Sequence, residues 1–265
     1  MKEDFDIIVH RFPRDNIRLY GIADLHLAAK ECMEKEFIAF RDMILADDHA
    51  YVAVGGDLLN NGIKSSVSNI YEEVMRPREA KRVMTELLKP LAEDGRILCG
   101  TGGNHERRSG KEVDEDIIGD IFCKLNIEDV FRENMCFVKL QFGEQRADGK
   151  KNPTYRLMVT HGAGGGMLTG GAVNRAERFG GIIDGIDLIM VGHTHKPFTT
   201  APAKLVFDPY NNRVSVKPFR VVSMSSWLSY GGYAMQKMLL PSSTYADVPQ
   251  VITLHGKRKK IEVTM

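Results

Sequence analysis

The chain has 265 residues, of which 43% are hydrophobic and 27% charged, and its formal net charge at pH 7 is +1. This composition argues against disordered and fibrous proteins, and the length is sufficient for one globular domain, residues 1–265, with a sizeable core. The near-zero net charge gives no global field that would hold long nucleic acid without specific contacts.

The N-terminal residues mix charges with short apolar runs, unlike a signal peptide, and no apolar stretch approaches membrane-spanning length. Four cysteines, none in a CxxC pair, favour reduced thiols. We therefore expect a cytoplasmic protein with no membrane partner.

The first half of the chain alternates short β-rich runs with longer amphipathic stretches, a pattern typical of strands joined by helical crossovers. Strands are predicted at residues 17–23, 51–55 and 96–100, and helices at 30–46, 66–93 and 113–125. We expect an interruption of the second helix near Pro77, because proline removes a backbone donor and restricts the residue before it.

The second half is richer in predicted strands. Residues 136–142 and 155–160 should form two strands joined by a polar hairpin, and residues 186–191 a further strand. Beyond Lys196 the pattern predicts mostly sheet with no strong helix. Glycines at 162–171 would let the backbone approach a ligand or let the loop close as a lid. Crossovers first and strands later predict a layered α/β sandwich, two packed sheets flanked by helices.

Five short polar clusters stand at or just after predicted strand ends, where α/β folds place binding loops. They are Asp24-Leu25-His26, Gly56-Asp57, Gly103-Asn104-His105-Glu106, Thr160-His161-Gly162 and Gly192-His193-Thr194-His195. One histidine alone is more often a surface or hydrogen-bonded residue than a ligand, but five ordered clusters favour a metal site. Carboxylate, imidazole and amide ligands without thiolate suit Mn²⁺, Fe or Zn²⁺.

The ordered set D-x-H, GD, GNHE, H-G and GHTH resembles the calcineurin-like metallophosphoesterase superfamily. The glycine-rich stretch at 162–181 is also similar to compact phosphoesterases of bacteriophages and prophages. The resemblance implies a four-layer α/β/β/α sandwich of two mixed sheets and a binuclear metal centre that hydrolyses phosphate esters.

Carried over motif by motif, the resemblance places Asp24, His26 and His195 on a first metal and Asn104, His161 and His193 on a second, with Asp57 bridging. A bridging carboxylate holds two cations at roughly 3.5 to 4 Å, as in two-metal phosphoryl chemistry. A hydroxide shared by the metals is the implied nucleophile. Mn²⁺ is the expected ion, with Fe, Zn²⁺ or Ni²⁺ as alternatives.

The resemblance gives His105 the role of stabilising the transition state or protonating the leaving oxygen. A reference pKa of about 6.5 suits an imidazole to that task. Phosphatases of the superfamily often carry GDxxD, whose last aspartate orients this histidine, but here the position is Asn60. Asn60 is either a catalytic partner of His105 or only a turn residue. A neutral amide stabilises an imidazolium less than a carboxylate does, which disfavours a protein phosphatase.

Three arginines are predicted to bind the substrate phosphate: Arg107, Arg108 and Arg175. The alternative is that they are solvated surface charges. The leading functional hypothesis is a phosphodiesterase acting on nucleotides or nucleic acid. A phosphomonoesterase or protein phosphatase is the nearest alternative, and a catalytically silent binding scaffold is an alternative of another class. The oligomeric state stays open, with a homodimer among the options.

Overall fold

The computed structural model describes residues 4–64, 66, 70–143, 152–164 and 168–265. Two sheets contain both parallel and antiparallel strand pairs. The first sheet has the order β13 (Ile261–Thr264), β12 (Val251–His255), β2 (Asn16–Ile22), β3 (Ala50–Val54) and β4 (Ile97–Gly100). The second has the order β1 (Ile8–Phe12), β5 (Met135–Phe142), β6 (Thr154–Thr160), β7 (Leu188–Val191), β11 (Arg220–Ser223) and β8 (Phe198–Thr200).

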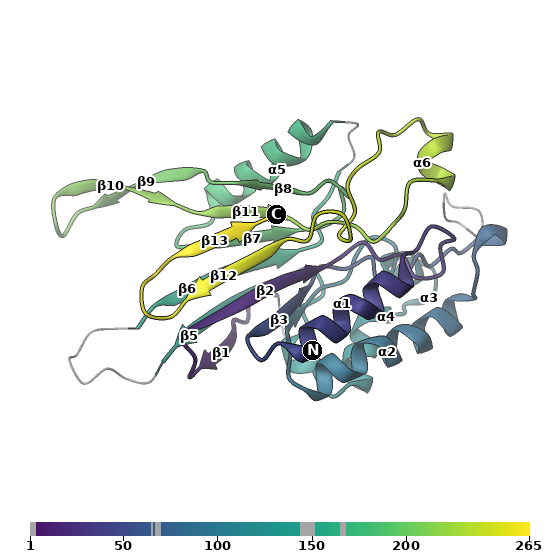
Figure 1. Ribbon diagram of the computed structural model, residues 1–265. Helices are drawn as coiled ribbons and strands as arrows, with labels where there is room; N and C mark the ends of the chain where they lie inside the picture. The colour runs from purple at the N-terminus through teal and green to yellow at the C-terminus, as the bar shows by residue number, and fades with distance from the viewer. Residues whose placement is uncertain (1–3, 65, 67–69, 144–151, 165–167) are drawn as a thin grey trace.

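Helices cover both outer faces of this pair of sheets. On one side lie α1 (Glu34–Ala46), α2 (Pro77–Glu93) and α4 (Ile117–Lys124), and on the other lies α5 (Thr169–Ile182) (Figure 1). Shorter helices are α3 (Arg107–Val113), α6 (Gly232–Gln236) and the 3-10 turns Ile70–Glu72 and Glu128–Val130. A ribbon of β9 (Ala203–Asp208) and β10 (Arg213–Pro218) projects from the body (Figure 1). The predicted α/β/β/α sandwich is confirmed.

Apolar side chains fill the three spaces between these four layers. Leu19 and Leu140 contribute to the cluster between the two sheets. Phe37 and Leu88 belong to the cluster between the first sheet and its helices, and Ala176 of α5 packs over the second sheet. β3, β4 and β7 are almost wholly buried, as expected for parallel strands that are covered on both faces. This burial holds the carboxyl ends of the strands, and the loops that follow, in fixed positions.

The structure corrects several predicted boundaries. The helix predicted over 66–93 begins at Pro77, because proline is favoured in the first helical turn, where its missing N–H costs no hydrogen bond. Within the span 113–125, which was predicted as one helix, only α4 is helical, apart from Val113, the last residue of α3. Asp114 lies between the two helices with a left-handed φ of 56°, and Asp116 then caps α4 by accepting the N–H of Gly119.

Several elements were not predicted, among them α5 and β1. α5 begins at Thr169, inside the stretch that the sequence predicts as a glycine-rich loop, and its few buried residues give only a weak helical pattern. Gly180 of α5 lies against Phe219 and Ile189, where an added Cβ would approach them to 2.4 and 2.6 Å. β1 pairs in parallel with β5, far along the chain.

Predictions that fall on 67–69, 144–151 and 165–167 lie outside the described residues. β5 and β6 are antiparallel neighbours, as predicted.

In the described part of the chain, no helix combines the length and the apolar character needed to cross a membrane.

Candidate metal centre

Loops after five strands meet at one edge of the two sheets. β2, β3 and β4 of the first sheet lead to Asp24, Asp57 and Asn104, and β6 and β7 of the second lead to His161 and His193. The first two loops are joined by main-chain hydrogen bonds, from Asp24 N to Gly56 O at 3.0 Å and from His26 N to Asp57 O at 3.0 Å. The residues that the sequence assigns to metal binding therefore come together from distant parts of the chain.

The backbone at this edge is held in an uncommon conformation. Five of the seven predicted ligands have a positive φ: Asp24 (54°), His26 (49°), Asp57 (51°), His193 (72°) and His195 (54°). Such angles cost free energy in non-glycine residues and cluster at functional sites. Gly56, with φ of 81°, is required as glycine because an added Cβ would lie 2.4 Å from Gly103 N. The packed sheets thus impose a backbone that aims these side chains inward.

Asp24, His26 and His195 form the first group of potential ligands. His195 Nε2 lies 3.3 Å from Asp24 Oδ1 and 3.2 Å from His26 Nε2. Asp24 is fully buried, and among the described residues no hydrogen bond reaches its Oδ1 atom. A buried carboxylate oxygen without a hydrogen bond is costly unless a cation or a further donor lies beside it.

Asp57, His161, His193 and Asn104 form the second group. His161 Nε2 lies 3.1 Å from Asp57 Oδ2, 2.9 Å from Asn104 Oδ1 and 3.2 Å from His193 Nδ1. Asp57 Oδ2 also lies 3.9 Å from His26 Nε2, so this carboxylate stands between the two groups. The ligand atoms of Asp24, His26 and His195 lie within 4.8 Å of one another, and so do those of Asp57, His161 and His193. The spacing is compatible with two cations that share Asp57.

The donor chemistry of the second group fits a cation. His161 Nδ1 lies 2.8 Å from the main-chain carbonyl of Gly55, which accepts its proton. In the neutral tautomer Nε2 then carries a lone pair, and it faces two oxygen acceptors, of Asp57 and Asn104. Converging acceptors repel one another unless a proton or a metal ion lies between them. A carbonyl that orients a ligating histidine through its other nitrogen is a common feature of metal sites.

Without a cation, a proton takes this place. Burial lowers the pKa of His161, but its hydrogen bond to Asp57 and the charge of that carboxylate outweigh burial and raise the pKa to about 9. Burial opposes the ionisation of Asp57, yet the bond to His161 and the surrounding histidines hold the pKa of this carboxyl well below its ordinary value. The two side chains therefore form a buried ion pair that a divalent cation would replace.

His105 lies beside the two groups, with Nε2 3.9 Å from Asp57 Oδ2. Its Nδ1 donates to the main-chain carbonyl of Asn60 at 2.8 Å. The Asn60 side chain points elsewhere and donates to Glu73 Oε1 at 2.5 Å. In the structure, Asn60 therefore contacts His105 through its main-chain carbonyl and not through its side-chain amide. Burial lowers the pKa of His105, and the charge of Asp57 opposes this effect.

Glu106 is a buried residue of the site whose role the sequence does not reveal. Its carboxylate accepts main-chain N–H groups of Asp57, Leu59 and Gly103 at 3.1, 2.9 and 3.0 Å. Burial and the charge of Asp57 raise the pKa of Glu106 to about 7, while the bond from Leu59 opposes this. The only signal in the sequence is its place at the end of the GNHE motif.

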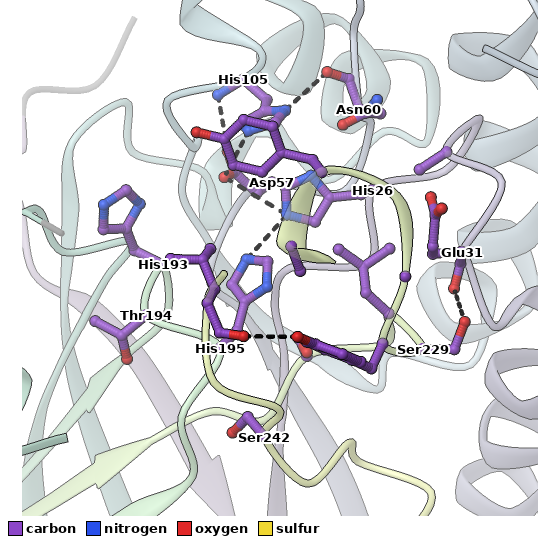
Figure 2. Close-up of a pocket in the computed structure, with 18 of the residues that line it drawn as sticks. His26, Glu31, Asp57, Asn60, His105, His193, Thr194, His195, Ser229 and Ser242 are labelled. Atoms are coloured by element: carbon purple, nitrogen blue, oxygen red, sulfur yellow. Dashed lines mark hydrogen bonds and ion pairs between the residues drawn. The ribbon is translucent and has the colours of Figure 1, made fainter. Parts of the chain in front are cut away.

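A cavity of about 840 Å³ opens over the site. Figure 2 shows His26, Asp57, His105 and His195 around one space at this cavity. Of the three predicted substrate-binding arginines, Arg108 is among the described residues that line it, and its Nη1 donates to Asn60 O at 3.1 Å. Arg107 donates to Glu133 O at 3.2 Å and Arg175 donates to Ala163 O. The structure thus brings Arg108 to the cavity and turns the other two toward main-chain carbonyls.

The opposite side of the cavity is lined by residues 226–242, which the sequence predictions did not connect with the site. The only signal in the sequence was the run of aromatic residues and methionines after the last motif. Such a run is as typical of ordinary packing as it is of a binding surface.

A comparison with protein-family models agrees with this arrangement. The model of the calcineurin-like phosphoesterase family matches residues 17–197, a span that contains all seven predicted ligands. No curated protein matches the chain. Among solved structures, the chain is similar to the nuclease MPE of Pseudomonas putida, with 13% sequence identity, a TM-score of 0.35, and coverage of 92% of this chain and 87% of that one. The chain belongs to the calcineurin-like phosphoesterase family and is a metal-dependent hydrolase of phosphate esters.

Proposed function

We propose that this hydrolase cleaves phosphodiesters of nucleotides or nucleic acid at a centre of two divalent cations. The observation that carries the proposal is the position of Asp57, whose Oδ2 lies 3.1 Å from His161 Nε2 and 3.9 Å from His26 Nε2. A carboxylate placed between two ligand groups is what a shared bridge requires. The completeness of the ligand set argues against a catalytically silent scaffold.

Seven side chains would hold the cations: Asp24, His26 and His195 the first, Asn104, His161 and His193 the second, and Asp57 both. Bound cations would supply an acidified attacking water and offset charge on the phosphoryl oxygens. Mn²⁺ is our proposed ion, because carboxylate and amide oxygens combined with imidazoles suit it, and Fe, Zn²⁺ or Ni²⁺ are alternatives.

His105 would act on the leaving group. The Asn60 carbonyl holds its Nδ1 proton, which leaves Nε2 to carry a second proton toward the leaving oxygen. Because burial lowers the pKa of His105, the imidazolium form needs a nearby negative charge, which the ester itself provides. Arg108 lines the same cavity and is placed to contact a phosphate oxygen.

Two observations support a diester over a monoester. The carboxylate that orients the corresponding histidine in many phosphatases of the family is replaced here by a main-chain carbonyl, which stabilises an imidazolium less. The cavity of about 840 Å³ is also of a size that holds drug-sized ligands, so it has space for groups on both sides of a phosphorus atom. A phosphomonoesterase is the second candidate.

Assays of the Mn²⁺-loaded protein on bis(p-nitrophenyl) phosphate and on p-nitrophenyl phosphate test this proposal. We expect the diester to be preferred in kcat/KM, activity to disappear on chelation, and Asp57→Asn to lose both activity and metal stoichiometry. Asp42→Asn, a matched change on an exposed part of α1, should retain both.

Preference for the monoester would replace the proposed activity by the second candidate. Fewer than two bound metals together with no esterase activity would favour the scaffold. The single-domain organisation over residues 1–265 and the cytoplasmic location stay predictions.

A further inference from the structure

The cavity over the metal centre has one wall that the family match does not include. This wall is formed by residues 226–242, between β11 and β12, whereas the match ends at residue 197. The segment contributes eleven of the residues that line the cavity. The catalytic motifs all lie before residue 197, so this later segment adds a wall to the cavity that those motifs do not supply.

The wall is attached directly to the loop that follows β2. Trp227 N donates to Asp24 O at 3.1 Å, and Ser229 donates from N and from Oγ to Glu31 O at 2.9 and 3.2 Å. Farther along, the Tyr230 hydroxyl donates to Leu239 O at 2.8 Å and closes the segment on itself. Figure 2 shows Ser229 and Ser242 on one side of the pocket and His105 and Asn60 on the other, with His195 between them in this view. The wall is therefore an ordered surface across from the proposed general acid.

The lining side chains of this wall are aromatic, aliphatic or polar, and none carries a charge. All eleven lining residues from the segment are uncharged. Tyr230 and Tyr233 are 46% and 49% exposed, and Leu240 is 52% exposed. Gln236 and Ser242 bring amide and hydroxyl groups to the same lining. Exposed apolar surface beside a catalytic site is costly to leave in water and marks a place where a ligand binds.

We propose that this wall binds the nucleoside of a small nucleotide ester, with its base stacked on Tyr230 or Tyr233 and its polar edge at Gln236 or Ser242. This inference rests on the proposed function and specifies its substrate. Aromatic side chains stack on the π-face of any base, and amide and hydroxyl groups match the donors and acceptors of a base edge.

Two other occupants fit the wall less well. A lipid chain would leave the amide and hydroxyl groups without partners. A polynucleotide would run its phosphates along a surface that offers no cation from this segment's lining, whereas proteins that bind nucleic acid neutralise successive phosphates. Lys237, the one charged residue of the segment, lies over the Tyr233 ring, with Nζ 5.9 Å from its centroid. The observations therefore favour a short ester with one base.

Two esters with the same leaving group test the proposal: thymidine 5′-(p-nitrophenyl) phosphate and ethyl p-nitrophenyl phosphate. With Mn²⁺ present, we expect kcat/KM to be at least about tenfold higher for the thymidine ester, within the effect of base stacking. The ratio of kcat/KM for the thymidine ester to kcat/KM for the ethyl ester should then be measured for Tyr233→Ala and for Tyr230→Ala. At least one of these variants should lower the ratio about fivefold or more, by raising the KM of the thymidine ester. Tyr233→Phe, which keeps the ring, should retain the ratio.

The matched control is Tyr210→Ala, at the tip of the β9–β10 ribbon, where the side chain is 95% exposed. It should leave the ratio and both activities unchanged. Thermal unfolding of each variant verifies folding, and Tyr230→Phe separates loss of the bond to Leu239 from loss of the ring. A wild-type ratio near one, or a ratio that neither alanine variant lowers, would overturn the subsite.

Binding of thymidine 5′-monophosphate, measured by calorimetry, separates failure of the subsite from failure of the proposed function. If neither ester is hydrolysed but the nucleotide binds and Tyr233→Ala or Tyr230→Ala weakens it, the proposed activity fails while the subsite is supported. If both esters are cleaved equally and the nucleotide does not bind, the subsite fails and the activity survives. Preferred cleavage of a thymidine oligonucleotide over the small ester would contradict the restriction to short substrates.

Discussion

The Glu106 carboxylate accepts the main-chain N–H of Asp57, the proposed bridging ligand, at 3.1 Å. The same carboxylate accepts the N–H of Leu59 and of Gly103, while Asp57 Oδ1 accepts the N–H of His105 at 2.8 Å. These reciprocal bonds tie the loop after β3 to the loop after β4. One buried side chain thus sets the relative position of two loops that carry candidate ligands, without being a candidate ligand itself.

Replacing Glu106 by glutamine is expected to loosen both loops. An amide offers one acceptor oxygen in place of two and points its own N–H₂ at a main-chain donor, so unfolding free energy should fall by about 2–3 kcal/mol. Affinity for Mn²⁺ should fall about 10- to 100-fold, as for other residues that orient ligands. Urea unfolding and calorimetric Mn²⁺ titration measure the two effects. Glu112→Gln, an exposed change on α3, is the control, and wild-type Mn²⁺ affinity in Glu106→Gln would refute the positioning role.

Placing an aspartate at position 60, as in the GDxxD pattern of many phosphatases, should not improve catalysis. In Asn60→Asp the new carboxylate would face Glu73 Oε1, which the Asn60 amide now contacts at 2.5 Å, and the like charges would repel. His105 would still be oriented by the carbonyl of residue 60. We expect kcat on a phosphomonoester to stay equal or fall, with lower thermal stability. Asn60→Ala should keep kcat within about threefold, because the carbonyl remains. A rise of tenfold or more in Asn60→Asp would show that the side chain controls His105.

Removal of His105 should separate chemistry from metal binding. General acid catalysis contributes about 10²- to 10⁴-fold to rate, so His105→Ala should lower kcat by that order on esters with poor leaving groups. The loss should be much smaller on p-nitrophenyl esters, whose leaving group needs little protonation. Two metals per chain should still bind, as measured by elemental analysis. An equal loss on both kinds of ester would argue against proton donation by His105.

Cation binding should release a proton near neutral pH. The pKa of His161 is raised to about 9 by Asp57, so His161 is charged at pH 7 and must lose a proton before Nε2 can bind a metal. Apparent Mn²⁺ affinity should therefore rise with pH between about 6 and 9, and level off above the pKa of His161. Calorimetry in two buffers with different ionisation enthalpies counts the released protons. No release at pH 7 would mean that the Asp57–His161 ion pair does not form.

The parts of the fold that sequence predicts well are those governed by local pattern. The buried runs of β2, β3, β4 and β7 are short and apolar, and the polar residues that follow them mark the loops. The pairing of two segments that lie more than 100 residues apart leaves no local pattern in the sequence. β1 is recognisable only through its pairing with β5, and α5 only through the face it buries on the second sheet.

The candidate site likewise has features that the sequence displays and features that only the fold creates. The seven candidate ligands stand in short motifs that the sequence displays, and their assignment follows from the family resemblance of those motifs; the structure brings the motifs together at one edge of the sheets. Contacts made by the backbone cannot be predicted in this way, because every residue has a carbonyl, and so the role of Asn60 O on His105 was not foreseen. The wall of residues 226–242 was also missed, since tyrosine and leucine acquire a binding role only from where the fold places them.

Asp187 provides a test of how the strand that leads to the last motif is held. It directly precedes β7, which ends shortly before His193, and its carboxylate accepts three bonds from Arg156 at 2.9 to 3.1 Å and pairs with Lys259 at 2.7 Å.

Although burial raises the pKa of the Asp187 carboxyl, these partners outweigh it and hold the pKa below its ordinary value. The stabilising contribution is therefore present above about pH 5 and is lost as pH falls through the lowered pKa. Because the Arg156 side chain is half exposed, solvent screens part of the interaction. We expect Asp187→Asn to lower the free energy of unfolding by about 1–2 kcal/mol at pH 7, with the difference shrinking only as pH falls below about 4. Urea unfolding across this range measures the effect, with exposed Asp184→Asn on the same turn as the control. A difference that is constant with pH would show that the charge of Asp187 contributes nothing.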